Sequence, residues 1–127
     1  MKKEIIICIF IIILIIIGNI ITQNYTKECV YQMNEKLYKL KEVSINENKN
    51  SVNENIKDIE IKWNDIKQNL SYYLEHDELE KVETQIFNMR GLYEIEQYKE
   101  IIPELEKCVY ILEHIRDKTT LNIKNIF

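Results

Sequence analysis

Apolar residues recur three and four positions apart through the middle of the chain, from Ser51 to Glu96. A first stripe consists of Val52, Ile56, Ile59, Trp63, Ile66, Leu70 and Tyr73, and a second of Leu79, Val82, Ile86, Met89 and Tyr93. This spacing places each stripe on one face of an α-helix, whereas a strand would alternate every second residue. A polar break at Glu75-His76 separates the stripes. The pattern therefore predicts two helices joined by a short turn, which forces them to lie antiparallel.

The register of this hairpin predicts a core. Trp63 and Ile86 should be buried between the two helices, and Trp63 should lie near Asn88, Met89 and Arg90. We expect Trp63 to pack in the core, because Trp63 lies on the apolar stripe rather than beside it.

Capping residues predict where these helices begin. Ser51 and Glu54 have the spacing of a capping box, which would start the first helix at Ser51. Asp77 and Glu80 repeat this chemistry at the start of the next helix. Gly91 falls inside the second stripe, so we expect an interior glycine that lets a neighbouring helix approach closely.

Two further helices flank the hairpin. The earlier one, from Tyr25 to about Val43, is followed by a polar linker over residues 46–50 and has its stripe at Val30, Met33, Leu37 and Leu40. The later one should begin between Tyr98 and Ile102, because Pro103 is tolerated only in a first turn. It should end near Lys118, and its stripe is Ile101, Leu105, Cys108, Leu112 and Ile115.

The N-terminus carries an apolar run from Ile5 to Ile21, interrupted only at Gly18-Asn19, and one long helix could run from it into the helix that starts near Tyr25. As a helix it would span about 25 Å, slightly less than the roughly 30 Å of a hydrocarbon core. We favour an uncleaved single-span anchor over a cleaved signal peptide, because residues 18–24 lack the small residues of a cleavage site. Lys2 and Lys3 should hold the N-terminus in the cytoplasm, leaving the domain outside the plasma membrane.

The expected fold is all-α, with one transmembrane helix followed by an antiparallel bundle of about four helices. We divide the chain into a cytoplasmic stub and anchor (residues 1–22), a bundle domain (23–118) and an apolar tail (119–127). The tail includes Ile126 and Phe127 and should either fold back onto the open end of the bundle, burying both residues, or dock into a partner. We favour folding back, since it needs no second protein.

Composition and the absence of known motifs argue against several classes of function. The chain has 127 residues and a formal net charge of -4 with no basic run, which argues against nucleic-acid binding. Three widely spaced cysteines form neither a disulfide framework nor a zinc pattern. We identify no phosphate-binding loop, no nucleophile elbow and no small-molecule substrate, so we expect no cofactor and no enzymatic activity.

One constellation has two interpretations. His76, Asp77, Glu80 and His114 could meet at one end of an antiparallel bundle and hold a metal ion. The plainer interpretation is a helix cap together with a histidine near a helix C-terminus, where its positive form suits the dipole. We favour the plainer one.

Tyrosine is abundant, and six tyrosines fall off the stripes: Tyr25, Tyr31, Tyr38, Tyr72, Tyr98 and Tyr110. Exposed tyrosines favour protein contacts, and Tyr25 could lie at a membrane interface. Filling the edge of the core is an equally good explanation for the set.

Several features together resemble a known family: the short N-terminal anchor, Trp63 in mid-chain, residues 76–79 (HDEL), residues 112–115 (LEHI) and the terminal residues 125–127 (NIF). Nearly the whole chain resembles domain of unknown function 4363, a family of small, singly anchored proteins of low-GC Gram-positive bacteria. The resemblance implies the architecture and brings no activity, substrate or catalytic residue.

We therefore expect a membrane-tethered, non-enzymatic interaction module on the extracytoplasmic face, with another membrane or envelope protein as partner. The alternative from a different class is a small extracytoplasmic ligand or metal sensor that uses the His76/His114 end of the bundle.

Overall fold

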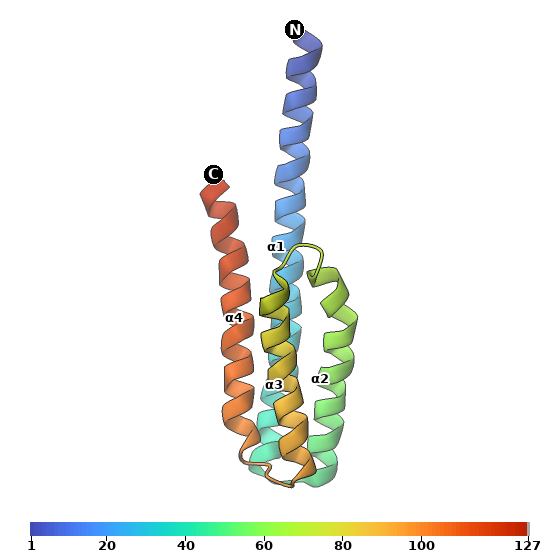
Figure 1. The fold of residues 1–127 in the computed structure, drawn as a ribbon, viewed down its shortest axis with the longest axis vertical. Helices are drawn as coiled ribbons and strands as arrows, with labels where there is room; N and C mark the ends of the chain where they lie inside the picture. Colours follow the sequence, from blue (N-terminus) through green and yellow to red (C-terminus); the bar gives the residue numbers. More distant parts are fainter. Residues whose placement is uncertain (127) are drawn as a thin grey trace.

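Four helices make up the described part of the chain. The computed structural model describes the backbone of residues 1–126 and the side chains of residues 1–120. The helices are α1 (Lys2–Ile45), α2 (Lys49–Leu70), α3 (His76–Glu94) and α4 (Ile101–Ile126), and the described residues contain no strand. Each helix runs antiparallel to the one before it (Figure 1). The all-α prediction is confirmed.

The helices form a closed four-membered bundle. Helix α1 packs against α2 and α4, and α3 packs against the same two, so that α1 and α3 lie diagonally across the core. The predicted stripes supply this core: apart from Tyr73 and Tyr93, which are partly buried, all their residues are buried. Trp63 and Ile86 are both buried, as the hairpin pattern predicts.

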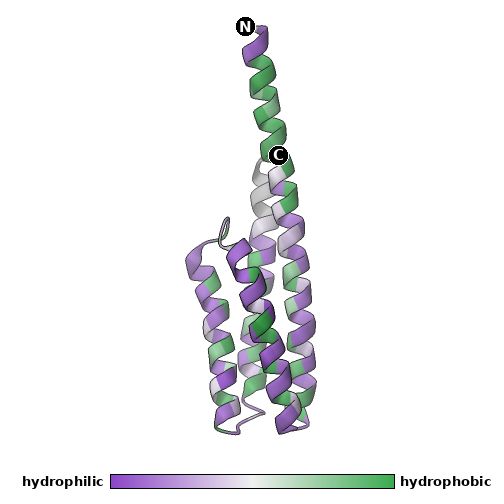
Figure 2. Ribbon diagram, turned by 90° about the vertical axis from the view of Figure 1, so that its right-hand side faces the viewer, coloured by the Kyte–Doolittle hydropathy of each residue, from purple (hydrophilic) through white to green (hydrophobic). Residues whose placement is uncertain are grey.

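The predicted anchor and the first bundle helix are a single helix. Helix α1 runs without a break through Gly18-Asn19, and its N-terminal part projects alone beyond the bundle (Figures 1 and 2). The exposed large apolar side chains from Ile5 to Ile21 have relative accessibilities of 45% to 65%. Within the described residues, α1 is the one helix long and apolar enough to cross a membrane.

Helix α2 begins earlier than the sequence predicts. Its first residue is Lys49, and the side chain of Asn48 accepts a hydrogen bond from the backbone N–H of Ser51 at 3.3 Å. The predicted capping box of Ser51 and Glu54 is therefore wrong. Glu47 adopts a positive φ of 53°, which turns the chain so that Asn48 arrives in the extended conformation of an N-cap.

The predicted cap of α3 is also wrong. Helix α3 starts at His76, one residue before Asp77, and the N-cap residue Glu75 makes no side-chain capping bond. Asp77 instead lies within the first turn, where its negative charge favours the positive end of the helix dipole. Residues 71–75 join the two helices, a longer connection than the predicted turn.

Gly91 lies inside α3, as predicted, but the expected reason is wrong. A Cβ atom built at this position would meet no atom within 4 Å beyond its own helical surroundings. No neighbouring helix approaches it, and the residue is exposed.

Helix α4 starts within the predicted interval but continues past Lys118 to Ile126. The hydroxyls of Thr119 and Thr120 donate to the carbonyl oxygens of Ile115 and Arg116 at 2.9 and 3.1 Å. These bonds satisfy both side chains within the helix, so the two threonines do not end it. The predicted burial of Ile126 and Phe127 lies outside the described side chains.

Candidate functional site

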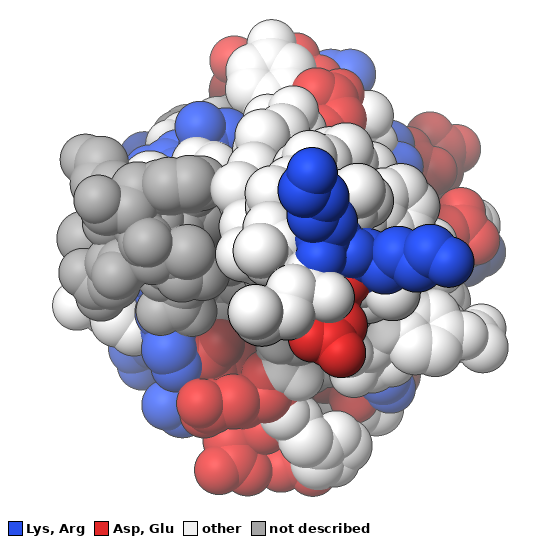
Figure 3. Space-filling model, turned by 90° about the horizontal axis from the view of Figure 1, so that it is seen from above, with Lys and Arg blue, Asp and Glu red and all other residues white. Residues whose placement is uncertain are grey.

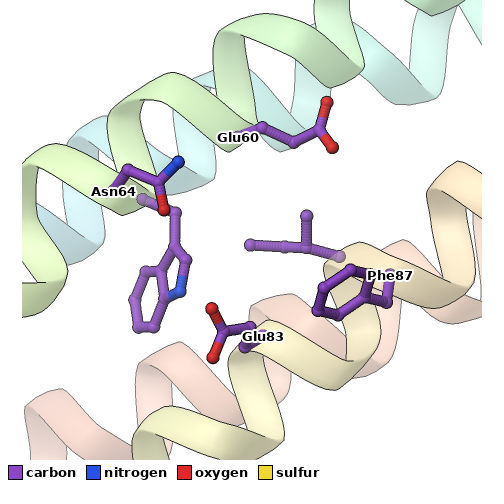
Figure 4. A pocket seen from close by; sticks show the side chains of 6 residues that line it. Glu60, Asn64, Glu83 and Phe87 are labelled. Atoms are coloured by element: carbon purple, nitrogen blue, oxygen red, sulfur yellow. The ribbon is translucent and has the colours of Figure 1, made fainter.

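A hollow of about 100 Å³ lies between α2 and α3. It is lined by Glu60, Trp63, Asn64, Glu83, Ile86 and Phe87. Figure 4 shows Glu60 and Asn64 reaching in from α2, and Glu83 and Phe87 from α3. The volume is comparable to that of one medium-sized apolar side chain.

Two ion pairs fix this hollow by locking α2 to α3. Arg90 donates to both carboxylate oxygens of Glu60 and reaches the side-chain oxygen of Asn53 at 2.8 Å. Lys67 pairs with Glu83 at 2.7 Å at the other side of the hollow. These pairs place Trp63 beside Ile86 and Phe87, slightly earlier along α3 than the predicted Asn88 to Arg90.

Arg90 has a structural role at the contact between α2 and α3. The sequence indicated only that Arg90 would lie near Trp63. Its guanidinium also lies 5.4 Å from the ring centre of Tyr93, within range of a cation–π contact. Arg90 thus ties one position of α3 to two residues of α2 and to the next turn of its own helix, which gives the hollow rigid walls.

Among the described residues, the indole N–H of Trp63 has no hydrogen-bond partner. The side chain is 2% exposed, and Nε1 is buried without a hydrogen bond. An unsatisfied buried donor costs free energy, on the order of 1–3 kcal/mol. Because Trp63 also lines the hollow, an acceptor that entered there would recover this cost.

An exposed apolar ring marks the rim of the hollow. Phe87 is 70% exposed although it lies next to the core. Ile61, the neighbour of Glu60 on α2, is also exposed. An exposed aromatic beside a hollow is typical of a protein contact surface.

The four candidate metal ligands do not form one cluster, although two of them pair. The Nε2 atom of His76 lies 2.9 Å from Glu80 Oε1, one turn along the same helix. Asp77 lines a shallow surface with Glu80, whereas His114 lines a different one with Glu78 and Lys81. In the part of the chain that the structure describes, no three His, Cys, Asp or Glu residues form a metal-binding group.

The cysteines outside the apolar run are buried, and burial disfavours their thiolate forms. Burial raises the pKa of the Cys108 thiol to about 12 and raises the pKa of Cys29 in the same direction. A reactive cysteine requires the opposite shift, because the thiolate is the nucleophile. Cys108 behaves as the small core residue that its position on the stripe predicts.

The six tyrosines off the stripes divide into exposed and buried ones. Tyr31, Tyr38, Tyr72 and Tyr110 are exposed, whereas Tyr98 is buried and Tyr25 is partly buried against the core. Sequence reasoning missed Phe87 and the carboxylates of Glu60 and Glu83. Their positions just off the stripes were the available signal, since such residues face the neighbouring helix.

Comparisons with known proteins identify a family and nothing closer. A family model described as a domain of unknown function (DUF4363) matches residues 20–126. No curated protein and no solved structure matches the chain.

Proposed function

The chain belongs to the DUF4363 family, and from that premise we propose that it is a membrane-tethered, non-enzymatic module that binds another protein on the outer face of the plasma membrane. The observation that carries the proposal is the continuity of α1. One helix contains both the exposed apolar stretch and a quarter of the bundle core.

The continuity of α1 would fix the position of the bundle relative to the membrane. A helix of 44 residues is about 66 Å long, enough to cross a bilayer and continue into a folded domain. Because no flexible linker separates the two parts, the bundle would stand at a fixed height above the membrane. Confinement of this kind raises the effective concentration of the module toward other membrane proteins.

The basic residues at the N-terminus support the orientation. Lys2 and Lys3 precede the apolar stretch, and lysines next to a span favour the cytoplasmic side. The bundle would then be extracytoplasmic.

The surface between α2 and α3 is the best candidate for the protein contact. It combines the exposed Phe87 ring, a hollow of side-chain size and the unpartnered N–H of Trp63. A partner that inserted an apolar side chain and offered a backbone carbonyl would match all three features. Aromatic side chains at the centre of an interface are typical sources of binding energy.

Site-specific photocrosslinking in cells tests this proposal. A photoreactive amino acid at Phe87 should capture a defined membrane or envelope protein, whereas the same group at the exposed Lys39 of α1 should not. Equal products at both positions, or none at Phe87 in a chain that reaches the membrane, would contradict the proposed contact surface.

A further inference from the structure

One end of the bundle lies level with the end of the apolar stretch. Tyr73, in the connection between α2 and α3, has its hydroxyl 2.6 Å from Thr26 Oγ1 and 3.4 Å from the carbonyl oxygen of Thr22. Thr22 follows Ile21, the last residue of the apolar run. The connection over residues 71–75 is therefore held within about one helical turn of that run.

Helix α4 reaches the same level from the other side of α1. The side-chain amide of Gln23 donates to Thr120 Oγ1 at 3.4 Å. The two helices are antiparallel, and α4 continues from Thr120 to Ile126, which adds about 9 Å. Its backbone therefore ends near the level of Gly18, inside the apolar run, and Figure 1 shows this end rising past the α2–α3 connection.

A bilayer placed around α1 would meet both segments. If the hydrocarbon begins near Ile21, the headgroup layer on that side occupies roughly the next 5–8 Å, since a bilayer is about 40–45 Å thick and its hydrocarbon core about 30 Å. We propose that this end of the bundle, residues 71–75 together with the last two turns of α4, is a lipid-contact surface that seats the domain directly on the membrane. The proposal rests on the membrane anchoring proposed above.

The described side chains of the connection suit the headgroup layer. Tyr72 is 77% exposed although its neighbours Tyr73 and Leu74 pack toward the core. Exposed tyrosines concentrate at membrane interfaces because their rings are amphipathic. In sequence, the last turns of α4 read Leu-Asn-Ile-Lys-Asn-Ile over residues 121–126, so three large apolar residues alternate with polar ones and with Lys124.

The described charges at the connection do not favour anionic lipid. Lys118, which contacts the connection at Glu75, is paired with Glu75 at 3.3 Å and with Glu78 at 3.1 Å. Among the side chains that Figure 3 colours, acidic and basic ones are mixed around the rim of this end, without a field of one sign. The lipid contact should therefore be interfacial and should not require anionic lipid.

Fluorescence quenching by brominated lipid tests the proposal. The full chain carrying Trp63→Phe and Tyr72→Trp is reconstituted in phosphatidylcholine vesicles with brominated acyl chains. Ile95→Trp, also well exposed but in the connection at the opposite end of the bundle, is the matched control. We expect the fluorescence at position 72 to fall several-fold and that at position 95 to remain unchanged.

A further variant and lipid comparison sharpen the result. Ile126→Trp should be quenched at least as strongly as Tyr72→Trp, and replacing part of the lipid by phosphatidylglycerol should change neither value. If Trp63→Phe fails to fold, the same substitutions are compared in the chain that retains Trp63, whose buried indole serves as a constant background.

The outcomes separate this inference from the proposed anchoring. Equal quenching at positions 72 and 95, or no quenching at position 72 in a chain that floats with the vesicles, would overturn the lipid-contact surface. Quenching that required anionic lipid would overturn its interfacial character. A chain that did not float with vesicles would overturn the anchor itself, and the lipid contact with it.

Discussion

Trp63 is the largest side chain in the core and lies where α2 faces α3. Truncating it would leave a cavity between two helices that ion pairs hold at fixed spacing. We expect Trp63→Ala to lower the free energy of unfolding by about 3–5 kcal/mol. Chemical denaturation of the detergent-solubilised chain, followed by circular dichroism, measures this loss.

Trp63→Phe is the informative companion. Phenylalanine retains most of the apolar volume and removes the unpartnered N–H, so its loss should be well below that of Trp63→Ala. If the alanine variant unfolded at the same denaturant concentration as the parent chain, Trp63 would not be the core residue described here.

Cys108 makes stability depend on pH in the alkaline range. Burial raises its pKa from 9.0 to about 12. Between these values the unfolded chain loses the thiol proton while the folded chain keeps it, so this contribution is intact below pH 9 and declines as the pH rises toward 12. The free energy of unfolding should fall by at most about 1.4 kcal/mol per pH unit from this group.

Cys108→Ala supplies the control for this pH dependence. The variant should be less stable at neutral pH because it loses core volume, but its stability should fall less steeply above pH 9 than that of the parent chain. Parallel pH profiles for the two chains would show that burial does not shift this thiol.

At the residue scale, the spacing of apolar residues identified the core. The side-chain type alone did not identify the residues that cap the helices. The stripe residues were predicted correctly because a spacing of three and four places residues on one face of an α-helix only. Asn48 and Ser51 are both good capping residues. The choice between them depends on the positive φ of Glu47, which the local sequence does not indicate. Phe87 was missed because exposure beside a hollow is a property of two helices together.

The start of α2 provides a test at the scale of the element. Asn48→Ala should cost about 0.5–2 kcal/mol, because it removes the acceptor for the Ser51 backbone N–H. Ser51→Ala is the matched variant and should cost clearly less, since Ser51 lies inside the helix. The denaturation midpoints of the two variants decide between the caps. A larger loss of stability for Ser51→Ala would support Ser51 as the N-cap and contradict Asn48.

Helix α3 carries an avoidable weakness at Gly91. The position is exposed and helical, and an added Cβ meets nothing within 4 Å. Gly91→Ala should therefore raise the free energy of unfolding by up to about 1 kcal/mol. Thermal denaturation measures the gain, and a lower midpoint would indicate that a neighbouring segment does approach this face.

The lengths of α1 and α4 were less predictable than their stripes. Gly18-Asn19 and Thr119-Thr120 look like helix breaks in sequence, yet both pairs lie within continuous helix. Threonine hydroxyls in both helices bond back to carbonyl oxygens, such as Thr26 to Thr22 at 2.7 Å. In addition, α1 and α4 pack along one another, which stabilises both beyond their intrinsic propensities.

At the scale of the whole molecule, the structure combines a lone apolar helix with a closed bundle. Both described ends of the chain lie at the same end of that bundle (Figure 1). The α2–α3 connection lies at that end too. With the membrane placed at that end, as proposed, the far end of the bundle and its sides remain accessible to a partner. The Phe87 surface lies on one of those sides, between α2 and α3.

Protease accessibility in intact protoplasts tests the central claim of an outward-facing tethered bundle most directly. Externally added protease should digest the bundle, while an epitope tag placed before Lys2 stays protected until the membrane is permeabilised. A bundle that resists protease in intact protoplasts but not in permeabilised ones would contradict the orientation. Release of a soluble form beginning near Gln23 would contradict the tether.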